Sequence, residues 1–386
     1  ARRTGATMLP SALQMGPDEL PQSSRQPPTG ARRNMPRRST TEAVAKCAPP
    51  KGPRLEGYLA QLKRAEKLDF ASWGGFAQNF ADRRIPFEHP SAAAYWERAK
   101  GESLQIPVFV SGPEGPYLPG NALKGALRTG VLFAMWKDSM PARLETLESE
   151  RLARRPGEIL EQEALGGSGT SLMRLVRFSD SRPVPTSALR IYMLRVATLQ
   201  PRGGGQFELG WKQAPRGSVE ARRVEESTPL FAEMAAPGTV FEGEWRENAY
   251  LTQPGVWEAL GWKQPLDTAA ILQAANEYAA RLLEAHRQYA RMAGLSLLAR
   301  DLDRIAGFLP SNGGRSCVLS IGWGSGLLAK SGFLETGAEA YRRALSQSAL
   351  YARVLNPAVP FPKTRRIVFV ENQPATLPGW ALLELE

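Results

Sequence analysis

Two segments of the chain have the clear hydrophobic period of an amphipathic helix. In residues 121–137 apolar side chains recur every three or four positions, and Asn121 follows a Pro-Gly turn where it can cap the helix. A second stripe fills residues 267–292, with Asp267 or Thr268 as its cap. The predicted buried faces comprise Leu123, Ala126, Leu127, Val131 and Ala134 in the first helix, and Ile271, Ala275, Tyr278, Leu282 and Tyr289 in the second.

Shorter alternating or β-branched segments predict strands. They cover residues 7–15, 104–110, 172–179, 189–198, 238–245, 317–321, 366–371 and 380–385. Residues 55–102 and 140–165 favour helices, and the glycines of Arg202-Gly203-Gly204-Gly205 form either a loop tip or the join between domains. Strands and helices mix without the regular repeat of a doubly wound sheet, which predicts the α+β class.

The length of 386 residues suits two domains, which we place at 1–205 and 206–386. Hydrophobic residues make up 42%, enough for a sizeable core, and no apolar run is long enough to span a membrane. The basic N-terminal stretch makes a poor signal peptide, since Pro10, Ser11 and Gln14 interrupt it. Cys47 and Cys317 give no disulfide framework, so we expect a reduced, cytoplasmic setting.

The formal net charge of +11 and the pI of about 9.8 favour a polyanionic partner. The excess is rich in arginine, much of it in pairs such as Arg365-Arg366, and guanidinium groups bind phosphate oxygens bidentately. A GC-rich genome would also raise the arginine content, and both explanations can hold. A basic, proline-rich segment at about 21–55 is predicted to be a loop.

No catalytic signature accompanies this charge. The two histidines, His89 and His286, lie far apart in the sequence, and an ordinary packed or surface role is the more common one for each. Walker loops, HExxH pairs, GxSxG elbows and metal-ligand spacings are absent from the sequence. We therefore expect no cofactor, no metal and no catalytic residue.

Two segments are suited to holding a phosphate backbone. Lys124 and Arg128 share one helix face near an N-terminus, where exposed N–H groups favour anions. The alternative is a solvated basic face. In Gly322-Trp323-Gly324-Ser325-Gly326, the glycines let the backbone approach a ligand, Trp323 can stack on a base or anchor the loop, and Lys330 follows.

These segments resemble the RAMP superfamily of CRISPR proteins. Residues 117–129 (YLPGNALKGALRT) are similar to its motif IPGSSLKGALRT, and residues 321–326 (IGWGSG) to its C-terminal glycine-rich loop. The resemblance implies two ferredoxin-like, RRM-type domains with helical and loop insertions.

Within the superfamily, further stretches resemble the family of Csm subunit five. They are residues 175–181 (LVRFSDS), the ending PKTRR at 362–366 with PGW at 378–380, and a degenerate opening at 11–20. The resemblance implies a non-catalytic subunit of a type III-A effector complex in antiviral defence. It would cap the backbone filament at the 3′-proximal part of the guide crRNA. The implied partners are crRNA, target RNA, the repeating Csm backbone subunit and the small helical Csm subunit.

From the resemblance and the residue types together, we predict a set of RNA-binding residues: Gly120, Asn121, Lys124, Arg128, Arg177, Gly322, Trp323, Gly324, Ser325, Gly326, Lys330, Lys363, Arg365 and Arg366. Two alternatives stay open. One is a metal-independent guide-processing endoribonuclease, for which His89, His286, Tyr117 and the basic residues are available, with Asp18 a further candidate for cleavage. The other is a different RAMP subunit, which holds the 5′ handle.

Overall fold

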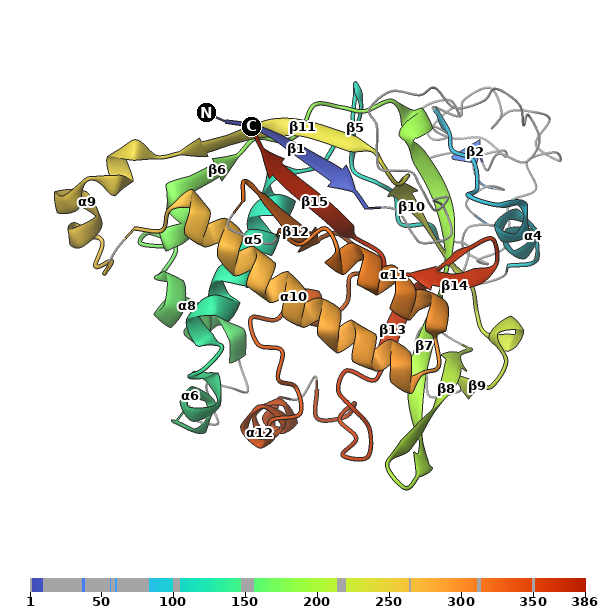
Figure 1. The fold of residues 1–386 in the computed structure, drawn as a ribbon. Helices are drawn as coiled ribbons and strands as arrows, with labels where there is room; N and C mark the ends of the chain where they lie inside the picture. The colour runs from blue at the N-terminus through green and yellow to red at the C-terminus, as the bar shows by residue number, and fades with distance from the viewer. Residues whose placement is uncertain are drawn as a thin grey trace.

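The computed structural model describes residues 2–9, 37–38, 56, 60, 83–99, 105–146, 156–213, 220–263, 265–310, 314–348 and 351–386. Two antiparallel sheets and the helices packed on them make up most of this part of the chain (Figure 1). The strands are β1 (Arg2–Met8), β2 (Arg37–Arg38), β3 (Arg83–Arg84), β4 (Ser111–Gly112), β5 (Gly115–Pro116), β6 (Val176–Phe178), β7 (Leu189–Gly203), β8 (Gln206–Lys212), β9 (Glu220–Ala221), β10 (Leu230–Ala235), β11 (Val240–Glu247), β12 (Ser316–Ser320), β13 (Thr364–Val370), β14 (Gln373–Thr376) and β15 (Trp380–Leu385). The α-helices are α4 (Pro90–Arg98), α5 (Gly120–Trp136), α6 (Met140–Thr146), α8 (Pro156–Leu165), α9 (Pro254–Ala259), α10 (Thr268–Met292), α11 (Ser296–Ala306) and α12 (Glu339–Gln347). Short 3₁₀ turns are η2 (Leu172–Leu175), η3 (Thr186–Ala188), η4 (Val224–Glu226), η5 (Ala249–Thr252) and η6 (Leu328–Lys330).

The first sheet has the strand order β12-β15-β1-β11-β6. Its strands β1 and β6 both run antiparallel to β11, so they are parallel to each other with β11 between them. Helix α5 joins them, which makes β1–α5–β6 the split βαβ unit of a ferredoxin-like fold. Helix α10 comes after β11 as α5 comes after β1. The chain then returns to this sheet as β12 and, at its end, as β15.

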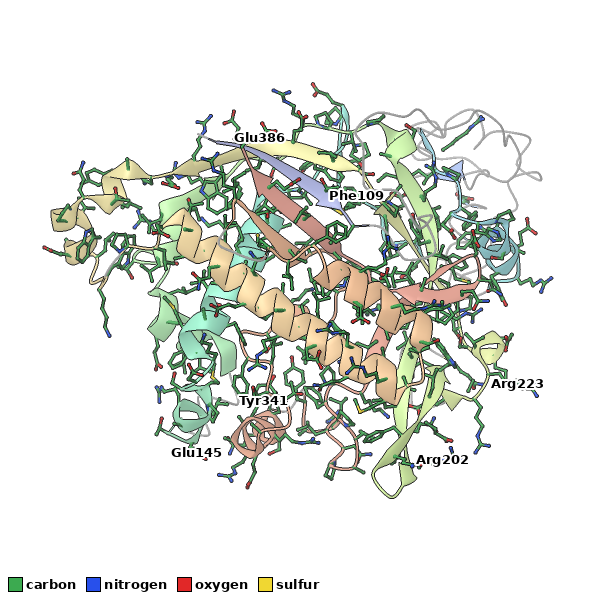
Figure 2. The ribbon with its side chains drawn as sticks, viewed as in Figure 1. Phe109, Glu145, Arg202, Arg223, Tyr341 and Glu386 are labelled. Atoms are coloured by element: carbon green, nitrogen blue, oxygen red, sulfur yellow. The ribbon has the colours of Figure 1, made fainter. Side chains whose placement is uncertain are left out.

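The second sheet has the order β14-β13-β7-β8-β9, with β10 also paired to β7. Strand β7 is its long axis, because it pairs with β10 near its start, with β13 in its middle and with β8 toward its end. The β7–β8 hairpin projects from the body of the molecule with Arg202 near its tip (Figure 2). Gly203–Gly205 is thus a loop tip, one of the two roles expected for it.

Helix α10 connects two hydrophobic cores. Its first half contributes Ile271 and Ala275 to a core that also contains Leu127 of α5 and Trp245 of β11. The second half places Leu282 and its neighbours in another core, shared with α11 and the second sheet. Fully burying one such leucine stabilises the fold by about 1.5–3 kcal/mol, so α10 fixes the two sheets against each other.

Most of the predicted elements are confirmed within a few residues. Helix α10 begins as predicted, with the Asp267 carboxylate accepting a hydrogen bond from the Ala270 N–H at 2.6 Å. Helix α5 is also present, but its N-cap is Pro119 and not Asn121, which lies inside the helix. The described parts of the predicted 140–165 helix form two helices, α6 and α8.

Three strand or helix predictions need correction. Residues 105–110 are no strand, since Pro107 lacks an N–H and this segment makes single contacts to β10 rather than a ladder. Residues 172–175 form a 3₁₀ turn, and only Val176–Phe178 is strand. In the predicted 55–102 helix, residues 83–89 are not helical and α4 covers 90–98. Most of the rest of that segment, residues 10–15 and most of the basic loop 21–55 lie outside the described residues.

Each sheet takes strands from both sides of residue 205. The division into domains at that residue therefore stays a prediction, while the two sheets are the evident units of the described structure. Among the described residues, no helix is long and apolar enough to cross a membrane.

Candidate nucleic-acid interface

The glycine-rich loop follows β12 and turns on residues with positive φ. Gly322, Gly324 and Gly326 have φ angles of +83°, +93° and +86°, a region that disfavours residues with a Cβ. The Ser325 hydroxyl donates to the Gly322 carbonyl at 3.0 Å and closes the turn. A Cβ on Gly324 would lie 3.0 Å from Cγ of Pro378, so the loop also packs tightly on the segment before β15.

Trp323 and Arg366 join the glycine-rich loop to β13. The Arg366 guanidinium lies 4.9 Å from the centroid of the Trp323 ring, a cation–π contact. The indole nevertheless remains 46% exposed, which is unusual for so large an apolar side chain. Nε of Arg366 is buried and has no hydrogen-bond partner among the described residues. The fold thus brings together two segments that the sequence analysis had singled out separately.

A cavity of about 240 Å³ lies beside this contact. Its wall includes the backbone of Gly324–Gly326 and the cationic residues Lys212, Arg365 and Arg366. Among the described residues that line it there is no aspartate or glutamate. The cavity is therefore electropositive, and the loop presents main-chain groups at its edge in the kind of concavity that binds anions.

Arg365 is held rigidly in the wall of this cavity. Its Nε donates to Nδ1 of His286 at 3.0 Å, and its guanidinium carbon lies 4.4 Å from the Tyr289 ring centroid. Its Nη1 donates to the carbonyl oxygens of Pro362 and Thr364. Burial lowers the pKa of Arg365 to about 10, so the group stays charged at neutral pH.

His286 is the neutral partner in this arrangement. Burial, with the Arg365 charge as a smaller cause, lowers the His286 pKa well below its ordinary value. The ring is therefore uncharged at pH 7, and its Nδ1 serves as an acceptor.

Lys363 lies just outside the cavity and is not an isolated cation. Its Nζ lies 3.2 Å from Oε1 of Glu220, the same oxygen that pairs with Lys212 at 2.7 Å. Burial alone would raise the pKa of Glu220, but hydrogen bonds from both lysines outweigh it and leave that pKa below its usual value. One carboxylate thus neutralises part of the charge of two lysines.

The start of α5 is fixed by residues that sequence reasoning did not assign to it. The Gly120 N–H donates to Oδ1 of Asp180 at 2.8 Å, and the Leu118 N–H donates to the Ser181 hydroxyl at 2.9 Å. A Cβ on Gly120 would lie 2.5 Å from the carbonyl oxygen of Ser179, so only glycine fits. Asp180 therefore occupies the helix N-terminus proposed as an anion site, and Asn121 is exposed beside it.

The three cations of this region differ in their surroundings. Lys124 donates to the Val176 carbonyl at 2.9 Å, and its pKa is lowered by burial and by the charge of Arg177. Arg177 is exposed on β6. Arg128 forms an ion pair with Glu161 of α8, which competes with the clamp predicted for Arg128 and Lys124.

The other candidates lie apart from the cavity. His89 caps α4, with Nδ1 accepting from the Ser91 N–H at 3.3 Å. Lys330 is exposed at the end of η6, and Tyr117 is half-buried near the β4–β5 turn. Asp18 lies outside the described residues. No cluster of metal-ligating side chains occurs in the described part of the chain.

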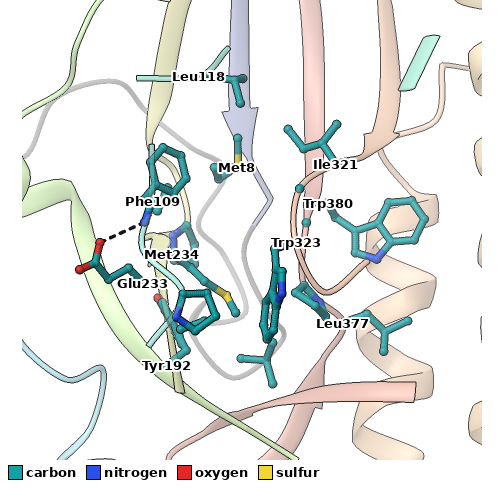
Figure 3. A pocket seen from close by; sticks show the side chains of 18 of the residues that line it. Met8, Phe109, Leu118, Tyr192, Glu233, Met234, Ile321, Trp323, Leu377 and Trp380 are labelled. Atoms are coloured by element: carbon teal, nitrogen blue, oxygen red, sulfur yellow. Dashed lines mark hydrogen bonds between the residues drawn. The ribbon is translucent and has the colours of Figure 1, made fainter. Parts of the chain in front are cut away.

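The two motifs do meet, at an apolar cleft between the sheets. Leu118, Pro119 and Ala122 from the first motif line it together with Gly322 and Trp323 from the glycine-rich loop. Figure 3 shows Trp323 in this cleft, between Met234 and Leu377.

The central part of the chain matches a known protein family. The family model of the RAMP superfamily matches residues 57–259, more than half of the chain. The chain therefore belongs to the RAMP superfamily.

Two solved structures have a similar fold. A chain from the cryo-EM structure of a Csm–crRNA–target RNA ternary complex of a type III-A CRISPR–Cas system is 20% identical, with a TM-score of 0.63 and full coverage of both chains. The crystal structure of Csm5 from T. onnurineus is 16% identical, with a TM-score of 0.54 and coverage of 98% of this chain and 99% of that one. At sequence identities of 20% and 16%, the similarity shows that the chains share a fold and shows nothing beyond that. No curated protein matches the sequence.

Proposed function

We propose that this RAMP protein is a subunit of a type III-A CRISPR effector complex and binds the 3′-proximal part of the guide crRNA. The single observation that carries the proposal is the electropositive cavity at the glycine-rich loop, with Arg366 stacked on an exposed tryptophan. The end-to-end similarity to a chain of a Csm–crRNA–target RNA complex and to Csm5 supports it.

The phosphate backbone would run across the loop. The Arg366 guanidinium lines the cavity, and its N–H groups would donate to an RNA phosphate there. Arg365, held by His286 and two carbonyls, keeps its charge fixed at the cavity wall. Lys124 and Arg177 form a second contact point near the other motif. Such contacts position RNA without reading its sequence.

A structural role fits the histidines better than a nuclease role. His286 is a buried acceptor for Arg365, and His89 caps a helix. Neither is placed as an exposed general base, which supports a non-catalytic subunit. In this proposal the chain caps the filament of Csm backbone subunits, contacts the small helical Csm subunit and lies near target RNA.

The test is guide binding at several salt concentrations by wild-type protein, Arg366→Met and Arg128→Met. Arg366→Met should weaken binding and reduce the slope of log affinity against log salt by about 0.7, the value for one phosphate of a single strand. Arg128→Met removes an equal charge already paired with Glu161 and should change the slope much less. Equal effects of the two variants, or no guide binding by the wild type, would contradict the proposal.

A further inference from the structure

The apolar cleft beside Trp323 is larger than the electropositive cavity and differs from it in chemistry. Its volume is about 290 Å³, and most of its lining is apolar. One wall is segment 107–110, which is held to β10 by a 3.0 Å hydrogen bond from the Phe109 N–H to the Glu233 carboxylate (Figure 3). Val108 and Val110, on this wall, are 47% and 45% exposed.

We propose that this cleft receives one unstacked base of the bound RNA, with Trp323 as its stacking platform. The inference rests on the proposed function, because it requires RNA to pass over the glycine-rich loop. It adds a particular site and a particular residue.

The first argument is continuity between the cleft and the electropositive cavity. Leu377 and Pro378 line both, and the loop contributes Trp323 to the cleft and Gly324–Gly326 to the cavity. A backbone held in the cavity would therefore have the cleft within reach of its base. An RNA strand needs this pairing of surfaces, since each nucleotide carries an anionic and an aromatic part.

The second argument is the environment of the indole. Arg366 lies over the Trp323 ring on the cavity side, while Met234 and Tyr192 belong to the cleft into which the indole extends (Figure 3). A base that enters the cleft can stack on the exposed part of the ring, and Arg366 reinforces the stack through its charge. This arrangement accounts for a tryptophan that is 46% exposed.

The third argument is size and polarity. A volume of about 290 Å³ lies just below the usual range for small-molecule pockets and is enough for one base. Because the lining is mainly apolar, stacking would hold the base with little preference among the four bases. An apolar side chain of a neighbouring subunit could also fill such a cleft, but it would leave the adjoining cationic cavity without an anion.

The experiment is an abasic scan of the guide. Guides with a single abasic site at each position in turn are bound to wild-type protein, Trp323→Ala and Trp323→Phe. Tyr250→Ala is the control, because Tyr250 is a 63% exposed aromatic residue on η5, away from the cleft. Wild type, Trp323→Phe and Tyr250→Ala should show one position where base loss weakens binding roughly tenfold. Trp323→Ala should bind the intact guide as weakly as wild type binds that abasic guide, with no further loss at that position.

The outcomes distinguish failure of the base-binding cleft from failure of the proposed guide-binding function. Guide binding that depends on Arg366 but is equally insensitive to base removal at every position would overturn the base cleft and leave the proposed function standing. A sensitive position that persists in Trp323→Ala would also overturn the cleft. Absence of guide binding by the wild type would overturn both. Equal melting temperatures of the variants exclude unfolding as the cause of a loss.

Discussion

Glu220 restrains the charge of the proposed RNA-binding surface, and its removal should strengthen guide binding. Lys212, Lys363 and Glu220 together carry +1 − 1 + 1 = +1, and the substitution Glu220→Gln raises this to +2 without changing the shape of the side chain. Lys212 lines the cavity and Lys363 adjoins it, so the added charge faces the proposed path of the RNA.

The expected gain can be estimated from the exposure of the pair. The side chains of Lys212 and Lys363 are 14% and 33% exposed, so Lys363 is the lysine nearer to solvent. One additional unit of charge should steepen the salt slope by about 0.7. At low salt we take the gain in binding free energy as about 1 kcal/mol, which is the upper value for an exposed ion pair. This gain corresponds to about fivefold tighter binding. The same substitution should lower the free energy of unfolding by about 1 kcal/mol. The side-chain amide of Gln200 donates a hydrogen bond to the Glu220 carboxylate, and in the variant it would face the N–H group of the new amide instead of an acceptor.

The assay is fluorescence anisotropy of labelled guide RNA over a series of salt concentrations. Glu163→Gln is the matched control, because Glu163 of α8 pairs with Arg143 of α6 and its loss adds the same charge elsewhere. In Figure 1 these helices and strand β9 lie on opposite sides of the molecule. The control should change affinity less than twofold. If Glu220→Gln binds no tighter than Glu163→Gln, the RNA does not pass this surface.

Three further predictions concern stability and binding. Gly120→Ala should destabilise the fold by about 3 kcal/mol in chemical denaturation, because its Cβ would meet the Ser179 carbonyl at 2.5 Å. The lowered pKa of His286 means that stability is full above its unfolded pKa of about 6.5 and falls as the pH drops below it, by up to about 1.4 kcal/mol per pH unit. His286→Gln should remove this part of the pH dependence in denaturant titrations. Arg128→Ala should lower the melting temperature through loss of the pair with Glu161 while leaving guide affinity within twofold.

The sequence predicted elements best where local signals agreed with packing. The α10 stripe is a clear example, since Ile271, Ala275 and Leu282 recur at helical spacing after a capping Asp267 and all three are buried. The cap of α5 could not be found this way, because Asp180 lies 60 positions away and reaches the helix only in the folded chain. The stretch Phe178–Ser181 (FSDS) is visible as a motif in the sequence, but the hydrogen bond from the Gly120 N–H to Asp180 exists only in the folded chain.

The candidate site shows the same division between local and tertiary information. Residue type identified Trp323 and Arg366 as candidates, and the fold places them in contact. Residue type could not show which cations are neutralised. Arg128 pairs with Glu161 of α8 and Lys363 pairs with Glu220 of β9, and both pairs form only in the folded chain. The apolar cleft was also missed, since its walls come from segments spread over most of the chain.

The central claim is that the glycine-rich loop and the Arg365–Arg366 segment hold the 3′-proximal guide RNA. The most direct test is photocrosslinking of the assembled complex carrying guides with 4-thiouridine at single positions, followed by mapping of the crosslinked peptides. Our account predicts crosslinks from peptides spanning 321–330 and 362–367 to the 3′ portion of the guide. Crosslinks from these peptides to the 5′ handle, or to no part of the guide, would contradict it.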